Sequence, residues 1–129
     1  MVKGYFSVDM KTIIAGSRNI SEMYYVETAI ALSHFEITEL ICGMAPGVDM
    51  LAHSYAKMCK IPIIECPADW VKHGKSAGLI RNNEMATKAE GLIAVWDGKS
   101  NGTRGMIYKA KNRKLKVFVF DISQFKFLF

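Results

Sequence analysis

The sequence predicts an α/β fold: a Rossmann-like three-layer sandwich with a mainly parallel central sheet of about five strands and helices on both faces. Three observations support this prediction. Short apolar runs rich in β-branched residues alternate with longer stretches of helical spacing. The run at 91–95 is apolar on both sides, as in a strand covered by helices on both faces. Glycine-rich polar segments follow the apolar runs, where such folds place their ligand loops.

The first elements are recognised by where their patterns begin and end. Residues 11–15 form a β-branched run that Gly16 ends. Residues 21–34 have apolar side chains at helical spacing, and Ser21 is the predicted N-cap. Residues 39–42 are a second short apolar run and predict the second strand.

The middle of the chain continues the alternation. Residues 48–59 have the apolar periodicity of a helix with one buried face. Residues 61–65 predict the third strand, because Pro62 is tolerated near a strand start. Residues 66–75 read as a loop, and 76–88 as a helix.

The last predicted elements continue the alternation of strand and helix. Residues 91–95 predict the fourth strand, and the Gly/Ser/Asn segment 97–102 predicts a loop. Residues 103–112 predict a helix, and 115–120 the fifth strand. The order βαβαβαβαβ with right-handed crossovers gives the predicted sandwich.

Length and composition favour one domain over residues 1–129, with a core at about 11–120. Half of the residues are apolar and 22% are charged, a globular balance. We expect a cytoplasmic protein without a membrane partner, because no apolar run is long enough to span a bilayer and the start lacks a signal-peptide pattern. The cysteines Cys42, Cys59 and Cys66 are expected to be reduced and partly buried.

The two ends of the chain carry further expectations. The first ten residues are expected to add an edge strand or to remain extended. The tail 125–129 is so apolar that we expect it to pack on its own domain or on a neighbouring subunit, which favours a homo-oligomer such as a dimer. No zinc-type Cys/His spacing is present, so no metal site is expected, and no cofactor is required.

Charge is unevenly distributed along the chain. The net charge is +5, but residues 1–65 carry five Lys/Arg against seven Asp/Glu, whereas residues 66–129 carry twelve against five. A basic half suits a phosphate-bearing partner, either a nucleotide or a nucleic acid. A solvated basic surface explains the same count, so both interpretations stay open.

Four polar segments are expected to meet at the carboxyl edge of the sheet, and they predict a site for an anionic ligand. Glycine turns that open a helix offer backbone N–H groups to phosphate. The segments are 16–19, 43–49, 66–75 and 97–103. Asp49, in a first helical turn, is expected to position a ribose or to brace its loop. His53, one turn later, has the placement of a structural histidine.

Candidate ligand contacts follow from these segments. Backbone amides near Gly16, Gly43 and Gly102 are expected to receive phosphate, and Arg81 is the side chain expected to reach it. Trp70 and His73 could stack on a base. The remaining predicted ligand-binding residues are Ser17, Arg18, Gly47, Asn82, Gly98, Ser100 and Thr103.

Together these motifs resemble the SLOG superfamily, and within it the small group related to YspA and cpYpsA. The resemblance covers about residues 11–120 and rests on the order of its pieces. They are Ile14-Ala-Gly-Ser-Arg18, Gly43-Met-Ala-Pro-Gly-Val-Asp49, Cys66-Pro-Ala-Asp-Trp70, Gly78-Leu-Ile-Arg-Asn82 and Trp96-Asp-Gly-Lys-Ser-Asn-Gly-Thr103. The resemblance implies a nucleotide or nucleotide-derived ligand.

Two branches of the superfamily imply alternatives. The DprA branch binds single-stranded DNA through a similar G-x-A-x-G-[IV]-D segment. The LOG branch cleaves nucleoside monophosphates at the N-glycosidic bond and uses a glutamate in the motif P-G-G-x-G-T-x-x-E. Met106 occupies that position here, and Asp97-Gly98 replaces the Pro-Gly pair, which disfavours hydrolysis. If a reaction occurs, Arg81 and Glu84 are the candidate catalytic residues.

Overall fold

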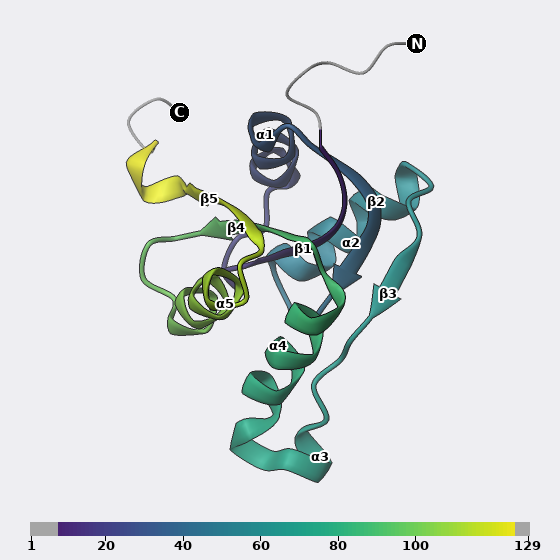
Figure 1. Cartoon of the computed structure of the whole chain (residues 1–129). Coiled ribbons are helices and arrows are strands. Elements are labelled where there is room, and N and C mark those ends of the chain that lie inside the picture. The colour runs from purple at the N-terminus through teal and green to yellow at the C-terminus, as the bar shows by residue number, and fades with distance from the viewer. Residues whose placement is uncertain (1–7, 126–129) are drawn as a thin grey trace.

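The computed structural model describes residues 8–125 and contains one five-stranded sheet in which every pair of neighbouring strands is parallel (Figure 1). The strand order is β3-β2-β1-β4-β5, so β1 lies at the centre between β2 and β4. This order confirms the predicted parallel sheet. The strands are β1 (Val8–Gly16), β2 (Phe35–Cys42), β3 (Ile63–Glu65), β4 (Gly91–Trp96) and β5 (Lys116–Asp121).

Helices cover both faces of this sheet. Helices α1 and α2 lie on one face and α4 and α5 on the other, whereas α3 and the first part of α4 extend beyond the sheet (Figure 1). This arrangement confirms the predicted Rossmann-like sandwich. The helices are α1 (Met23–Ser33), α2 (Val48–Met58), α3 (Trp70–His73), α4 (Ala77–Lys88) and α5 (Asn101–Asn112), with 3-10 turns at Gly74–Ser76 and Ile122–Gln124.

Strand β4 shows why the central strands read as continuous apolar runs. Ile93 and Val95 belong to the core under α1 and α2, whereas Leu92 and Ala94 belong to the core under α4 and α5. Successive side chains point to opposite faces, and both faces are covered. All four side chains are fully buried, so neither face of the strand tolerates a polar residue.

Several predicted boundaries were wrong. Strand β1 begins at Val8, so residues 8–10 extend a central strand and form no edge strand; residues 1–7 lie outside the described part. Strand β2 begins at Phe35 instead of residue 39. Its first half alternates half-buried and exposed positions, so it lacks the continuous apolar run on which the prediction relied. The predicted start of β2 was therefore too late.

The helix starts also differ from the prediction. Helix α1 begins at Met23 after Glu22, so Ser21 is not its N-cap, and the Ser21 amide donates to the Glu22 carboxylate at 3.2 Å. The predicted loop 66–75 contains α3, which begins after Asp69, whose carboxylate accepts the Lys72 amide at 3.0 Å. That contact is an N-cap that the sequence analysis overlooked.

The remaining expectations concern the tail, the cysteines and the membrane. Phe125 packs against Phe120 with ring centroids 4.9 Å apart, and residues 126–129 of the tail lie outside the described part. Cys42 and Cys66 are buried, but Cys59 is exposed, and all three thiols are unpaired. Over residues 8–125, none of the helices combines the length and apolarity needed to cross a bilayer.

Candidate functional site

A cavity of about 370 Å³ lies at the carboxyl ends of β1 and β4. Its walls come from the β1–α1 turn, the β2–α2 loop, α4 and the start of α5, so three of the four predicted segments meet there. The predicted segment 66–75 does not line the cavity, and α4 takes its place. The lining residues are Ala15, Gly16, Ser17, Arg18, Asn19, Ala45, Asp49, Arg81, Asn82, Met85, Asp97, Ser100, Gly102, Thr103 and Met106.

Arg81 is the best-positioned cation of this cavity. It lies on α4, is only 9% exposed, and its guanidinium donates to the carbonyl of Gly43 and, from Nε, to Asn82 Oδ1 at 2.8 Å. The carbonyl and the amide oxygen hold the side chain in one orientation. A buried arginine with a fixed fork is suited to pairing with phosphate.

Asp49, in the first turn of α2, lies beside Arg81 of α4. Its Oδ2 accepts the Ala45 amide at 3.2 Å, so the carboxylate closes the β2–α2 loop. Burial raises the pKa of Asp49 to about 6, against the opposing effects of the Ala45 amide and of the Arg81 and Arg18 guanidinium groups. The Asp49 side chain therefore braces the β2–α2 loop, which is one of the two roles predicted for it.

The glycines at 43 and 47 shape the site without lining it. A Cβ on Gly43 would lie 2.8 Å from Asp49 Oδ2 and 3.0 Å from Arg81 Nη1, so the missing side chain lets these two groups approach the loop. Gly47 has φ +83°, and a Cβ there would lie 2.5 Å from the carbonyl oxygen of Ser17. Gly47 thus allows the β2–α2 loop to pack directly on the β1–α1 turn.

Ser17 links the ends of β1 and β4. Its amide donates to the Val95 carbonyl at 3.1 Å, and its hydroxyl oxygen accepts the Asp97 amide at 3.0 Å. The Ser100 hydroxyl lies 3.0 Å from Ser17 Oγ and 3.0 Å from each Asp97 carboxylate oxygen. The Ser17 side chain is 1% exposed, so it fastens two loops together and is less available to a ligand than predicted.

Asp97 is the acceptor at the centre of this network. Burial alone would raise its pKa, but the Ser100 and Lys99 amides, both at 2.8 Å, and the hydroxyls of Ser100 and Ser17 lower the pKa to about 2. Asp97 is therefore ionised at neutral pH, and its carboxylate is held by hydrogen bonds from the residues of its own loop. Its role in the structure is to fix the β4–α5 loop.

The network leaves the N-terminus of α5 open toward the cavity. Ser100 is the N-cap residue, but its hydroxyl faces Asp97 and Ser17 and makes no cap hydrogen bond to the helix. The first amides of a helix have no partner within the helix, and the helix dipole is positive there. Gly102 and Thr103 in this first turn line the cavity, and a Cβ on Gly102 would meet open space. The geometry is that of an anion site.

Gly98 is a further predicted ligand residue that lies outside the cavity lining. It has φ +81°, and a Cβ there would approach Asp121 and Ser123, on the side of β5. Its role is to turn the chain toward α5, whereas Gly102, four residues later, faces the site.

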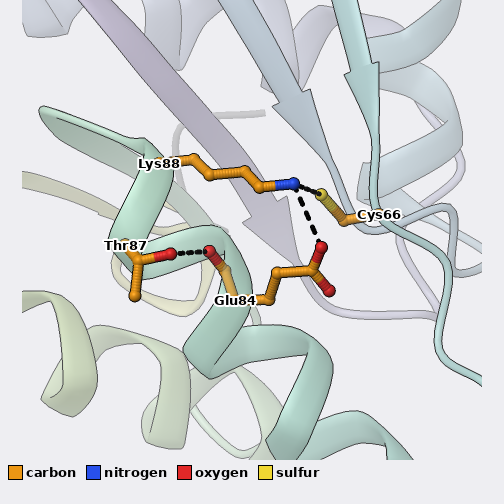
Figure 2. A network of polar contacts seen from close by, with 4 residues as sticks. All are labelled: Cys66, Glu84, Thr87 and Lys88. Atoms are coloured by element: carbon orange, nitrogen blue, oxygen red, sulfur yellow. Dashed lines mark hydrogen bonds and ion pairs between the residues drawn. The ribbon is translucent and has the colours of Figure 1, made fainter.

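Glu84, one of the two candidate catalytic residues, also lies outside the cavity lining. Its carboxylate pairs with Lys88 Nζ at 3.0 Å, and Lys88 Nζ lies 4.0 Å from Cys66 Sγ (Figure 2). Met106, which replaces the LOG glutamate, lines the cavity and is 1% exposed. The carboxylates that do line the cavity are Asp49 and Asp97, and both are held by amides.

The other polar and aromatic candidates are not among the residues that line the cavity. His53 Nε2 lies 2.9 Å from Glu65 Oε2, a contact between α2 and β3 that fits the structural role expected for this histidine. Trp70 and His73 are not in the cavity lining, and Trp70 is 52% exposed on α3. Among the described residues, no cluster of three His, Cys, Asp or Glu side chains could hold a metal ion.

The sequence analysis missed the apolar floor of the cavity. Ala15 comes from β1, Met85 from α4 and Met106 from α5, and these apolar residues line the cavity together with its charged groups. Asn19 and Ala45 complete the rim. Only Asn19 had a signal in the sequence, because it adjoins Arg18 in a polar turn after a strand; the apolar floor required knowledge of which helix covers which face.

A second cavity of about 350 Å³ lies on the other side of the β1–α1 turn. It shares Arg18 and Asn19 with the first cavity. Its other lining residues are Ile20 and Ser21 before α1, Gly47, and Met50, Leu51 and Ser54 of α2. Arg18 therefore stands between the two cavities. Gly47 lines this second cavity and not the first.

Comparison with known proteins bears on the same part of the chain. No curated protein matches the sequence. The family model described as the YspA, cpYpsA-related SLOG family matches residues 10–73. The matched segment runs from β1 to α3 and includes the β1–α1 turn, the β2–α2 loop and Asp49. Over residues 10–73, the chain belongs to the YspA, cpYpsA-related SLOG family.

Proposed function

We propose that the cavity at the carboxyl ends of β1 and β4 binds a nucleotide or a nucleotide-derived ligand. One observation carries the proposal: Arg18, Arg81 and the uncapped N-terminus of α5 converge on a single cavity. Two cations and a row of helix amides favour an anion of the charge of a phosphate. The volume of about 370 Å³ lies within the range of small-molecule sites.

The two walls of the cavity suit the two parts of such a ligand. The phosphate belongs at the first turn of α5 and beside Arg81. A base or sugar face belongs on the apolar floor of Ala15, Met85 and Met106. SLOG membership agrees with this class of ligand. We do not extend the proposal to hydrolysis through Glu84, because that carboxylate pairs with Lys88 outside the cavity.

Calorimetry with a panel of nucleosides, nucleoside monophosphates, diphosphates and dinucleotides tests the proposal. We expect phosphate-bearing compounds to bind at least about tenfold more tightly than the matching nucleosides, a difference of about 1.4 kcal/mol. Absence of heat, together with an unchanged melting temperature across the whole panel, would refute it.

Replacing Gly102 by aspartate is expected to remove phosphate binding without loss of stability. A carboxylate in the first turn of a helix is favourable to the helix by about 0.3–1 kcal/mol. At Gly102, however, it would occupy the open space at the mouth of the α5 amides and repel phosphate. The expected result in calorimetry is a loss of affinity of about tenfold or more.

Asn101→Asp is the matched control for Gly102→Asp. It adds the same charge to the same helical turn, but Asn101 does not line the cavity, and its oxygen already accepts Arg104 at 3.0 Å. This variant should retain most of its affinity. If both aspartate variants weaken binding equally, the effect is one of net charge, and the α5 N-terminus is not the phosphate site.

Anion binding is expected to strengthen as the pH falls. The pKa of Asp49 is about 6, so its negative charge in the cavity disappears on acidification. Sulfate is the suitable probe because its own charge stays constant, and its affinity should rise by about threefold or more from about pH 7.5 to about pH 5.5. Calorimetric titration with sulfate across this range measures the effect.

Asp49→Asn separates this effect from other titrations. Its amide oxygen can still accept the Ala45 amide, but it carries no charge at any pH. The sulfate affinity of the variant should be nearly independent of pH in this range. The raised pKa also means that the contribution of Asp49 to stability is largest below about pH 4 and is lost as the pH rises through about 6. A wild-type affinity that is flat with pH would show that Asp49 does not face the anion.

A further inference from the structure

The positive charge of the second half of the chain is largely separated from the cavity. Between Asp97 and Asp121 the sequence carries seven Lys/Arg and no Asp/Glu. Helix α5 begins at the cavity and runs back along the sheet for 12 residues, about 18 Å. The basic residues at its end therefore lie at the opposite edge of the sheet, beyond the reach of a ligand in the cavity.

The outer side of α5 combines this charge with an exposed aromatic ring. Arg104, Tyr108 and Lys111 are exposed and follow one another at spacings of four and three residues, so they share one side of the helix. Tyr108 is 69% exposed. Arg113 and Lys114 extend the charge past the helix end and are also exposed. We call these five residues the α5 basic face.

The helix dipole accounts for only part of this charge, and ion pairing does not account for the rest. Lys109 and Lys111 lie in the last turn of α5, where positive charge complements the dipole, but Lys114 lies beyond the helix, where the dipole effect fades. In the part of the chain that the structure describes, no ion pair engages any cation of the α5 basic face. The charges therefore remain available to a polyanion.

We propose that the α5 basic face binds single-stranded nucleic acid, independently of the nucleotide cavity. Successive phosphates can pair with Arg104 and Lys111 on one side of α5 and with Arg113 and Lys114 at and past its C-terminal end, and an unpaired base can stack on the exposed Tyr108 ring. The Arg104 guanidinium lies 5.3 Å from the centre of the Trp96 ring, which holds it at the cavity end of the α5 basic face. The combination of cations with an exposed ring favours a single strand, whose bases are free to stack.

Fluorescence anisotropy with a labelled oligothymidine of about 20 nucleotides tests this surface. We expect binding to the whole chain that weakens steeply as salt rises from about 50 to 200 mM. The triple variant Lys111→Gln, Arg113→Gln, Lys114→Gln should lose at least about tenfold in affinity and show a flatter salt dependence, by about two in the log–log slope. All three positions are exposed, so the variant should melt as the wild type does.

Two tyrosine variants test the stacking step. Tyr108→Ala should weaken oligonucleotide binding by about fivefold or more, whereas Tyr108→Phe keeps the ring and should bind like the wild type. Equal losses in both variants would overturn the stacking role. Equally tight binding of a duplex of the same length, with the same dependence on the three basic positions, would overturn the assignment to single strands.

Competition separates this proposal from the one for the cavity. A saturating nucleoside monophosphate should leave oligonucleotide binding unchanged, and Arg81→Ala should leave it unchanged as well, because Arg81 belongs to the cavity. Displacement by the nucleotide, or loss of binding in Arg81→Ala, would place the nucleic acid in the cavity instead. Absence of binding even at low salt would overturn the proposal and leave the nucleotide proposal untouched.

Discussion

Gly16→Ala is expected to lower the free energy of unfolding by about 3 kcal/mol or more, at the upper end of overpacking effects. A Cβ at this position would lie 2.0 Å from the backbone oxygen of Val95 and 2.7 Å from Val48 Cγ2. The nearest atom belongs to the main chain of the neighbouring strand, so no side-chain rotation can relieve the clash. Urea denaturation monitored by circular dichroism measures the loss.

Gly105→Ala is the matched control. Gly105 lies inside α5, and a Cβ there meets nothing within 4 Å. Because alanine has the higher helix propensity, this substitution should raise the free energy of unfolding by about 0.5–1 kcal/mol. If Gly16→Ala unfolds at the wild-type urea concentration, the close approach of β1 and β4 at the cavity is absent from the molecule.

Arg81→Ala is expected to weaken nucleoside monophosphate binding by about tenfold to a hundredfold, the value of one to two hydrogen bonds to a charged group. The guanidinium lines the cavity, is buried, and is held in place by the Gly43 carbonyl and Asn82. Isothermal calorimetry on the folded variant measures the loss of affinity.

Two further substitutions show whether the geometry or the charge of Arg81 matters. Arg81→Lys keeps the charge but not the fork, so its affinity should fall between those of the wild type and Arg81→Ala. Arg113→Ala removes an exposed arginine at the opposite edge of the sheet and should bind nucleotide like the wild type. Full affinity in a folded Arg81→Ala would exclude Arg81 from the ligand site.

The fold was predictable from the sequence wherever burial on both faces produces an unbroken apolar run. Strand β4 is such a case, and its predicted span, 91–95, ends one residue before the observed one. Strand β2 is the opposite case, because its first half is exposed on one side and alternates. The predicted N-cap of α1 was wrong for a local reason: Glu22 still has an extended backbone, so Glu22 and not Ser21 is the residue before the helix begins at Met23.

The loops that form the site could be predicted from the sequence, but the contact made by each residue in them could not. Glycine after a strand indicates a close approach or a tight turn, but the sequence does not say what approaches. Gly16 faces a carbonyl of β4, Gly98 faces Asp121, and Gly102 leaves open space at the start of α5. The hydroxyl oxygen of Ser17, an expected phosphate donor, also accepts the Asp97 amide and so links two loops, which the sequence does not reveal.

The cavity and the α5 basic face share one helix. The N-terminal turn offers uncapped amides to the cavity, whereas the exposed cations begin at Arg104 beside that turn and are most numerous at the C-terminal end. The basic half of the sequence is therefore not one surface. Charge counts along a chain cannot reveal this division, because it follows from the direction in which α5 runs along the sheet.

A crystal structure of the protein soaked with a nucleoside monophosphate tests most directly whether phosphate binds at the N-terminus of α5. The phosphate should lie at about 3 Å, hydrogen-bonding distance, from the first-turn amides of α5 and from the Arg81 guanidinium. The base or sugar should contact the floor of Met85 and Met106. A phosphate bound at the amino edge of the sheet, or only in the second cavity beside α2, would contradict the proposed function.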